Sequence, residues 1–390
     1  MSDVTRVALV AVLSGLLAGC PPGSTGPIGT CAADATARTG TATSALIGGG
    51  DPTCPEWGCG TNSPTLADGI VFDELDTAGG RDRHGIKIVD VKHDGVPVKL
   101  SVDRHTLSAR ATDGSDKPFT HGGLVGTIIT LEKDGQIYGF RIDGVDENSL
   151  RFWAGDTNEI VPFYKILVKV PGGQDFKTPL CRQNVGTAEK VWQPVEHSAI
   201  AFAGDHYDPP SKRVNDAEPA TTWFNLACAG TLTAKMHLMR HTNAGAWTPA
   251  TWTPGHEVTD PAAPFHTDVL QRQAMVKMFA ADYCGTGDAF TVDGQPLLYD
   301  DAAHWFQPRS LGVSALQVAA DGTLSPTGST MEALWTDRGA LCVSRPRHVD
   351  RAAVACLGGD KPLPLCTPEL VRGWDTRVHV SSANPPCPTP

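Results

Sequence analysis

The chain has 390 residues, of which 41% are hydrophobic, and a formal net charge of −11. This length is sufficient for two domains, and such a hydrophobic content can build ordinary cores. No run of lysine and arginine residues stands out, so we expect neither a nucleic-acid partner nor direct adsorption to lipid headgroups.

The first 20 residues predict export. Residues 7–18 are uncharged and follow Arg6. As a helix they would span about 18 Å, which is the size of a signal-peptide apolar region and too short for a membrane span. The segment LAGC at 17–20 resembles the lipobox of bacterial lipoproteins, which implies cleavage before Cys20 and acyl chains on that residue. The alternative is an ordinary signal peptide cut near the same place.

Acylation of Cys20 would make the membrane a partner of the protein, because several acyl chains give an effectively permanent anchor. Pro21 follows Cys20, where an aspartate tends to hold lipoproteins of Gram-negative bacteria at the inner membrane. The sequence therefore predicts a lipoprotein signal peptide at 1–19 and a location at the outer membrane or cell surface.

The cysteine count agrees with export. There are 11 cysteines, so an even number remains if Cys20 carries lipid. An even number in an exported chain is typical of a disulfide framework, although the sequence does not give the connectivity. Only the local pair Cys54–Cys59 in CPEWGC is predicted directly. The candidates are Cys31, Cys54, Cys59, Cys181, Cys228, Cys284, Cys342, Cys356, Cys366 and Cys387.

The first half of the chain divides into two parts. Residues 20–53 are rich in Gly, Pro, Ser, Thr and Ala, which predicts a flexible tether. Residues 54–174 show the period-two alternation of β-strands, as in VPVKLSV at 96–102. Asp-Gly pairs at 94–95 and 134–135 stand between apolar runs and predict hairpins. We expect a small antiparallel β domain here.

Residues 175–390 have a mixed pattern that ends in a Pro-rich tail. Apolar residues at roughly helical intervals suggest a helix within 221–241. A better helix begins near Thr267, the predicted N-cap, with Asp268 at the positive end of the dipole. Its predicted apolar face is Leu270, Ala274, Met278 and Ala281, and its predicted C′ residue is Gly285.

Two hairpins complete the predicted second half. They lie in FTVDGQPLLYDD at 290–301 and in MEALWTDRGALCVSRPR at 331–347. The predicted fold class is therefore α+β, predominantly β. An antiparallel N-terminal domain precedes a mixed, cysteine-rich domain with one or two helices.

Several motifs resemble the bacterial ADYC-domain proteins. The segment ADYCGTGDAFTVDGQPLLYDD begins at Ala281, and TTWFNLACAGTLTAK and MEALWTDRGALCVSRPR match the family's other elements in the same order. A CGTNS block lies within 54–75, so the resemblance covers 54–75 and 175–350. It implies an exported, cysteine-rich domain without an assigned activity. Met236 and Met275 stand where many members have cysteine, which fits one missing bridge.

Cys284 could be a nucleophile, a metal ligand or half of a disulfide. It follows a predicted helix, at the negative end of the dipole, and Asp282 adds another negative charge. Both effects disfavour the thiolate that a nucleophile requires. A disulfide is predicted, with Cys181, Cys228 or Cys342 as the expected partner.

Two groups of residues are weaker candidates for a metal. His237 and His241 are four apart and could share a helix face, but Leu238 stands where the acid of H-E-x-x-H is needed. Asp205 and Asp208 could offer oxygen ligands, although the spacing does not continue as a calcium loop. Surface or capping histidines and a polar turn are the expected roles, and no cofactor or metal is predicted.

Trp247 and Trp252 lie in the loop AWTPATWTP. Exposed tryptophans on such a loop could stack on a sugar or anchor a protein, whereas the alternative is that both rings fold back onto the domain. The sequence thus predicts a non-catalytic binding or structural lipoprotein with a protein or glycan partner. The alternative is an exported hydrolase or metal-dependent enzyme that uses His237, His241 or the Asp205 cluster.

Overall fold

The structure is a computed structural model. The predicted signal peptide, the predicted tether and Cys31, Cys54, Cys59 and Cys387 lie outside the residues that it describes. The described ranges are 74–112, 118–148, 152, 159–181, 198–208, 210–215, 222–228, 231–245, 267–291, 297–300, 317–318, 324–325, 330–347, 349–358, 362–367, 370 and 380–384.

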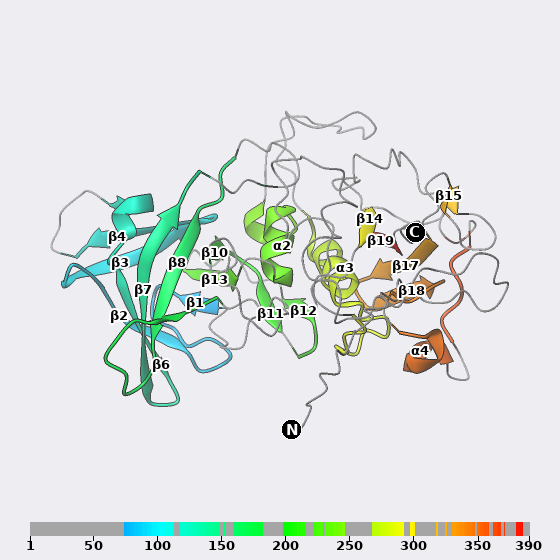
Figure 1. Cartoon of the computed structure of the whole chain (residues 1–390), viewed down its shortest axis with the longest axis horizontal. Coiled ribbons are helices and arrows are strands. Elements are labelled where there is room, and N and C mark those ends of the chain that lie inside the picture. Colours follow the sequence, from blue (N-terminus) through cyan, green and yellow to red (C-terminus); the bar gives the residue numbers. More distant parts are fainter. Residues whose placement is uncertain are drawn as a thin grey trace, which may run out of the picture.

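An antiparallel sheet of eleven strands forms one side of the molecule (Figure 1). Across the sheet the order is β1-β13-β10-β8-β7-β6-β2-β3-β4-β5, and β9 also pairs with β8. A short helix, η1 (His121–Leu124), connects β5 to β6. The strands are β1 (Glu74–Asp76), β2 (Lys87–His93), β3 (Val96–Asp103), β4 (Thr106–Ala111), β5 (Phe119–Thr120), β6 (Ile128–Lys133), β7 (Gln136–Asp146), β8 (Phe163–Lys169), β9 (Thr178–Pro179), β10 (Ser198–Ala203) and β13 (Trp223–Cys228).

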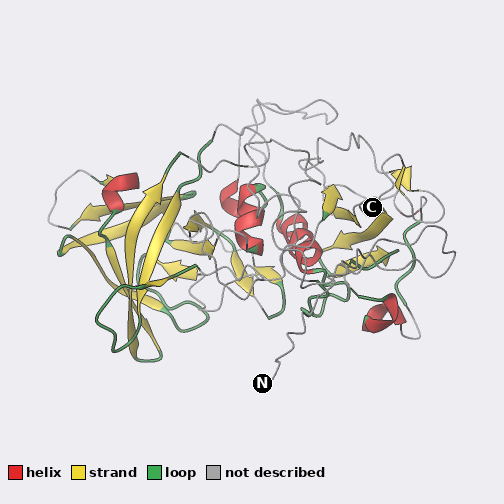
Figure 2. Ribbon diagram, viewed as in Figure 1, coloured by secondary structure: helices red, strands yellow, loops and turns green. Residues whose placement is uncertain are grey.

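The other side of the molecule combines helices with smaller sheets, as Figure 2 shows by colour. A four-stranded sheet has the order β14-β19-β17-β18, and two ribbons pair β11 with β12 and β15 with β16. The elements are β11 (His206–Asp208), β12 (Arg213–Asn215), α2 (Leu232–Leu238), η3 (Asn243–Gly245), α3 (Val269–Ala280), β14 (Leu298–Asp300), β15 (Gln317–Val318), β16 (Leu324–Ser325), β17 (Thr330–Thr336), β18 (Gly339–Val343), η6 (Arg351–Ala353), α4 (Ala355–Gly358) and β19 (Val380–Asn384).

Two of the predicted Asp-Gly hairpins, at 94–95 and 134–135, are confirmed. The third, at 293–294 within 290–301, lies outside the described residues. Asp94 (φ 50°) and Gly95 (φ 80°) connect β2 to β3, and Asp134 (φ 51°) and Gly135 (φ 74°) connect β6 to β7. Both central residues of each turn have positive φ, the backbone that a two-residue hairpin requires and that Asp-Gly adopts readily. The predominantly β, antiparallel fold class is also confirmed.

The eleven-stranded sheet continues past residue 175, where the sequence places the start of its second domain. Strand β10 pairs with β8 on one side and with β13 on the other. A disulfide between Cys181 and Cys228 joins the segment after β9 to the end of β13. The predicted boundary between residues 174 and 175 therefore does not coincide with an edge of the sheet.

The sheet separates two hydrophobic cores. Along β10, Ala199 and Ala201 face the first core, which also contains Leu131 from β6. The alternate residues Ile200 and Phe202 face the second core, which is completed by α2, α3 and the four-stranded sheet. This alternation follows from the period of two along a strand, and it lets one central strand serve both cores.

The prediction of a single helical pattern within 221–241 is wrong in its first half. Residues 223–228 form β13, a strand that is hydrogen-bonded to β1 on one side and to β10 on the other. Only 232–238 form a helix, α2. Pairing on both edges outweighs the helical spacing of a few apolar residues, because local preference is weak against tertiary context.

Helix α3 confirms the better helix but corrects its ends. Its N-cap is Asp268, whose Oδ1 accepts a hydrogen bond from Gln271 N at 2.8 Å, and not Thr267. Its last turn is closed by Ala281, which has φ 51°, so Gly285 is not its C′ residue. The predicted apolar face is wrong at Leu270, which is 45% exposed. Residues 271–280 are buried on every face because strands pack on more than one side of the helix.

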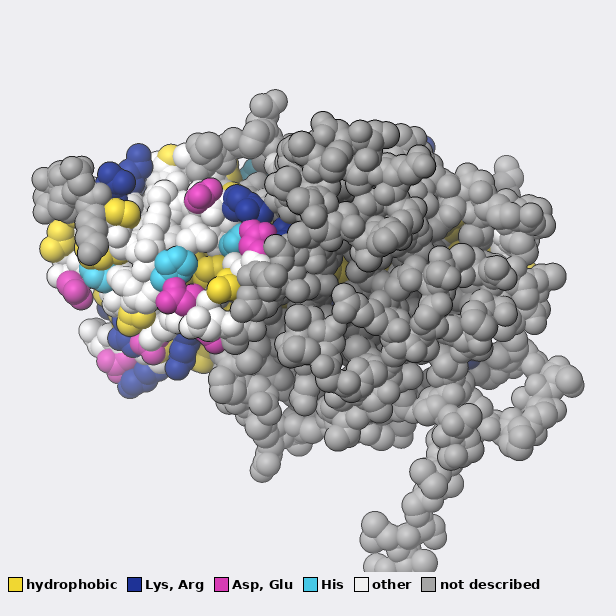
Figure 3. All heavy atoms as spheres, turned by 90° about the horizontal axis from the view of Figure 1, so that it is seen from above, with side chains coloured by type: hydrophobic (Ala, Val, Ile, Leu, Met, Phe, Trp, Pro, Cys, Tyr) yellow, Lys and Arg dark blue, Asp and Glu magenta, His cyan; other side chains and the backbone are white. Residues whose placement is uncertain are grey.

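Among the described residues, none of the helices combines the length and the apolar character that a membrane crossing requires. Figure 3 shows acidic, basic and histidine side chains interspersed on one face of the eleven-stranded sheet and its turns. Polar contacts in this part of the chain include the ion pair of Arg81 with Glu132 at 2.7 Å, and His121 Nδ1 lies 2.8 Å from Glu147 Oε2.

Candidate functional site

The motif Ala281–Cys284, which we call the ADYC turn, lies between the end of α3 and the hairpin of β17 and β18. Its backbone is bonded to that hairpin, since Ala340 N donates to Tyr283 O at 2.9 Å. The two segments approach so closely that a Cβ on Gly285 would lie 1.8 Å from Arg338 O. Glycine is therefore required directly after the turn.

Asp282 forms a buried ion pair. Its Oδ2 lies 2.6 Å from Lys277 Nζ and also accepts a hydrogen bond from Gly287 N at 2.9 Å. Lys277 donates in addition to Ser211 O at 2.9 Å. Both charged side chains are almost fully buried. The pair thus connects α3 to the turn and to the segment before β12.

Tyr283 belongs to a second buried network. Its hydroxyl donates to Glu332 Oε1 at 2.6 Å and accepts from Arg347 N at 3.0 Å. Arg347 Nε in turn donates to Glu332 Oε1 at 2.7 Å, and the tyrosine ring stacks on Trp335 at 5.1 Å. Burial raises the pKa of Tyr283 well above its usual value, so the phenol stays protonated and can donate.

Cys284 is half of a disulfide, as predicted, but its partner is Cys356. The expected partners are engaged elsewhere: Cys181 with Cys228, and Cys342 with Cys366. The Cα atoms of Cys284 and Cys356 lie 5.6 Å apart, within the ordinary range for a disulfide. The error arose because spacing along the chain does not show which segments meet in space.

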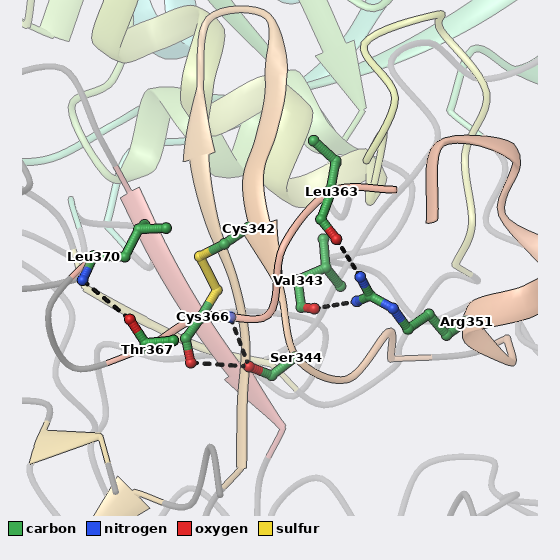
Figure 4. Close-up of a disulfide and its surroundings, with 8 residues drawn as sticks. All are labelled: Cys342, Val343, Ser344, Arg351, Leu363, Cys366, Thr367 and Leu370. Atoms are coloured by element: carbon green, nitrogen blue, oxygen red, sulfur yellow. Dashed lines mark hydrogen bonds between the residues drawn. A yellow bond between two sulfur atoms is a disulfide. The ribbon is translucent and has the colours of Figure 1, made fainter. Parts of the chain in front are cut away.

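The Cys342–Cys366 bridge pins a segment without helix or strand to the edge strand β18 (Figure 4). Ser344 Oγ accepts from Cys366 N at 3.2 Å, beside the bridge. Arg351 donates to Val343 O and to the carbonyl of Leu363. These contacts and the bridges attach residues 350–358 and 362–367 to the ADYC turn and to the hairpin of β17 and β18.

The two carboxylates of the predicted polar turn have partners other than a metal. Asp205 is fully buried and lies 3.0 Å from Arg272 NH2, and its Oδ2 accepts from Asn243 N. Asp208 accepts a hydrogen bond from the Ser211 hydroxyl. A guanidinium thus supplies the positive charge beside Asp205.

His237 and His241 do not share a helix face, because α2 ends at Leu238. Both rings are buried, which corrects the predicted surface role. His237 Nδ1 lies 2.9 Å from Thr242 Oγ1, whereas His241 Nδ1 lies 2.8 Å from Met239 O. Within the described ranges, no three side chains of His, Cys, Asp or Glu are placed to hold a metal ion.

His237 instead meets a histidine that the sequence did not single out. The ring of His105, from the turn between β3 and β4, lies 5.6 Å from that of His237, and Phe202 stacks on His237 at 4.6 Å. We call the two rings and their surroundings the histidine junction, which consists of Arg104, His105, Phe152, Glu159, Phe202, His237 and Arg240. The members of the histidine junction are far apart in the chain, so no short sequence motif predicts it.

The remaining candidates are not placed by the structure. Cys20 and the tryptophans Trp247 and Trp252 lie outside the described residues, so acylation and the binding loop stay predictions.

The geometry defines the class of protein: it is a predominantly antiparallel β protein. Around the ADYC turn, its second core is stabilised by the ion pairs Asp282–Lys277 and Glu332–Arg347 and by the Cys284–Cys356 disulfide. A family model described as the ADYC domain matches residues 121–349. The match covers more than half of the chain, so this protein belongs to the ADYC-domain family. The matched range begins well before residue 175 and does not include 54–75. Searches of curated proteins and of solved structures find no match.

Proposed function

We propose that this protein is a lipid-anchored protein of the cell envelope in which the ADYC domain is a non-catalytic binding or structural module. The observation that carries the proposal is the state of the ADYC turn. Asp282, Tyr283 and Cys284 are the side chains with acid–base or nucleophilic chemistry. Asp282 and Tyr283 are buried and bonded to Lys277 and Glu332, and Cys284 is partly buried and bonded to Cys356. They stabilise the fold and are not presented to a substrate.

The cysteines support an oxidising location. All six cysteines within the described residues are disulfide-bonded, and such bridges persist mainly in exported proteins. The lipobox-like LAGC at 17–20 supplies the route and the anchor in this proposal. The partner is a protein or a glycan, with Trp247 and Trp252 as the proposed contacts.

Metabolic labelling in the native host tests the anchor. Cells that express the full chain are fed an alkyne-tagged fatty acid, and the protein is followed in membrane and soluble fractions. The proposal predicts a labelled protein in the membrane fraction and an unlabelled Cys20→Ser variant that is released from it. An unlabelled wild-type protein in the cytoplasm contradicts the proposal.

Metal content and turnover test the non-catalytic part. Purified protein is expected to carry no stoichiometric metal and to hydrolyse no ester, peptide or glycoside substrate. One zinc ion per chain, or a hydrolytic activity that is lost in His237→Phe, would instead favour an exported hydrolase or metal-dependent enzyme.

A further inference from the structure

The histidine junction lies where the sheet meets the second core. His105 comes from the β3–β4 turn, His237 from α2 and Phe202 from β10. His237 is fully buried and His105 is 6% exposed. The ring of Phe152 lies 5.2 Å from His237 and 5.3 Å from His105, so aromatic carbon surrounds both imidazoles.

Each imidazole has one nitrogen with a partner and one without. The hydroxyl of Thr242 is bonded to His237 Nδ1, and the backbone of Ile160 is hydrogen-bonded to His105. His237 Nε2 and His105 Nδ1 are buried and have no hydrogen-bond partner in the described part of the chain. A neutral imidazole tolerates this arrangement because its second nitrogen needs only to accept, whereas an imidazolium would bury an unpaired N–H.

The charges around the two rings oppose protonation. Arg104 and Arg240 each form an ion pair with Glu159 at 2.8 Å. Arg240 also lies over the ring of Phe152, at 3.8 Å from its centroid. Glu159 Oε1 is 3.8 Å from His105 Nε2, but it already faces two guanidiniums. These are the charged groups that act on the rings from the β3–β4 turn, from the segment before β8 and from the segment after α2.

We propose that the histidine junction is an acid-sensitive contact: acid favours a state in which α2 has separated from the β3–β4 turn, because His105 and His237 bind protons more readily there than in the packed junction. The link between the sheet and the second core then loosens, while the ADYC turn keeps its ion pairs and its disulfide. This inference goes beyond the proposed function and does not depend on the identity of the partner.

The direction in which pH changes the stability follows from the pKa shifts of the two histidines. Burial, and then the charge of Arg104, lowers the pKa of His105 to about 4. Burial, and then His105, lowers the pKa of His237 well below its usual value. Both folded-state values lie below the unfolded value of about 6.5. The stability from the neutral rings is therefore fully present above about pH 6.5 and is lost as the pH falls from there towards 4.

The test is urea unfolding of the full chain at several pH values between 7 and 4.5. For His105, with a folded pKa of about 4, the equilibrium constant of unfolding rises about 40-fold between pH 6.5 and 4.5, and His237 acts in the same direction. Hydrogen exchange should show α2 losing protection before α3, after correction for intrinsic rates.

Matched variants separate the junction from general acid effects. His237→Phe with Thr242→Val removes both partners of one hydrogen bond and keeps the shape of the site, so the equilibrium constant of unfolding should rise less steeply with acid than in the wild type. Arg104→Asn retains a residue that tolerates φ 51° and removes one guanidinium. This raises the pKa of His105 towards its unfolded value, so the equilibrium constant of unfolding should rise less with acid. His121→Asn, at an exposed histidine away from the junction, should leave unchanged the order in which α2 and α3 lose protection.

Three results would overturn the inference. One is a double variant that loses stability with acid as steeply as the wild type. The second is equal protection of α2 and α3 throughout the range. The third is an acid transition that shifts when a chelator is added, which would assign the free nitrogens to a metal. If the double variant does not fold, Arg104→Asn and the exchange profile of the wild type still decide the question.

Discussion

The ADYC turn and the histidine junction both contain buried polar side chains, but their charges are balanced in different ways. At the turn, Asp282 faces Lys277, and Glu332 faces Arg347 and the Tyr283 hydroxyl. At the junction, two imidazoles lie near two guanidiniums, and both arginines pair with Glu159.

This difference indicates which of the two regions should be sensitive to pH. A buried charge with an opposite charge and hydrogen bonds stays charged, and removal of one partner is costly. A buried imidazole without a carboxylate of its own must stay neutral, so a change of pH alone can break the contact. The turn is therefore expected to resist acid, and the junction to yield to it.

Loss of the Arg347 guanidinium, which lies beside the ADYC turn, should lower the stability more than any other change considered. Arg347→Met removes the guanidinium that donates to the buried Glu332 Oε1, so the free energy of unfolding should fall by about 3–5 kcal/mol. Chemical denaturation measures the change. Arg338→Met is the control, because Arg338 is 91% exposed and should cost little.

The double variant Glu332→Gln/Arg347→Met sharpens this prediction. It also removes the charge of the buried Glu332 carboxylate, so part of the lost free energy of unfolding should be recovered. An Arg347→Met protein within about 1 kcal/mol of the wild type would show that the network around Tyr283 does not depend on the ion pair.

Loss of the Cys284–Cys356 bridge should rank next, at about 2–4 kcal/mol for the paired serine variant. The Cys342–Cys366 bridge closes a loop of 24 residues instead of 72, so its paired serine variant should cost up to about 1 kcal/mol less. Denaturation of both variants under non-reducing conditions gives the order. The reverse order would mean that native contacts, and not loop closure, determine the contribution.

Replacement of the N-cap residue of α3 should lower the stability less than loss of a disulfide. Asp268→Ala removes the side chain that accepts from Gln271 N, and should cost about 1 kcal/mol. Thr267→Val is the matched control, because Thr267 Oγ1 is buried without a hydrogen-bond partner in the described part of the chain. That variant should stay within about 0.5 kcal/mol of the wild type. Equal costs at the two positions would contradict the assignment of Asp268 as the cap.

Replacement of His206 should change the stability least, and its pH dependence should be opposite to that of the histidine junction. The hydrogen bond to Glu74 raises the pKa of His206, so its contribution is fully present below about pH 6.5 and is lost as the pH rises through the raised value. His206→Gln should therefore destabilise the protein more at pH 5.5 than at pH 8, by less than about 1 kcal/mol. Urea unfolding at the two pH values measures the difference, and an equal cost at both would contradict the role of Glu74.

Local patterns predicted the parts of the fold that local chemistry determines. The Asp-Gly turns at 94–95 and 134–135 and the apolar spacing along α3 are local signals, and the elements that they predict are present, although the N-cap of α3 is Asp268 and not Thr267. The disulfide state of Cys284 also followed from its surroundings in sequence. Strand β13 was missed because its partners β1 and β10 lie far from it in the chain.

The candidate sites show the same limit. Nothing in the sequence near Cys284 points to Cys356, and nothing near His237 points to His105, since both pairs form only when distant segments pack. Burial decided the roles of His237 and His241, and burial is a property of the whole fold. The pattern of two histidines four apart therefore predicted a shared face that the end of α2 removes.

The most direct test of the account is a disulfide map of native protein that is alkylated before digestion and analysed without reductant by mass spectrometry. It predicts linked peptides for Cys181–Cys228, Cys284–Cys356 and Cys342–Cys366. An alkylated, free Cys284 would contradict the central claim, because the ADYC turn would then present a thiol instead of a cross-link.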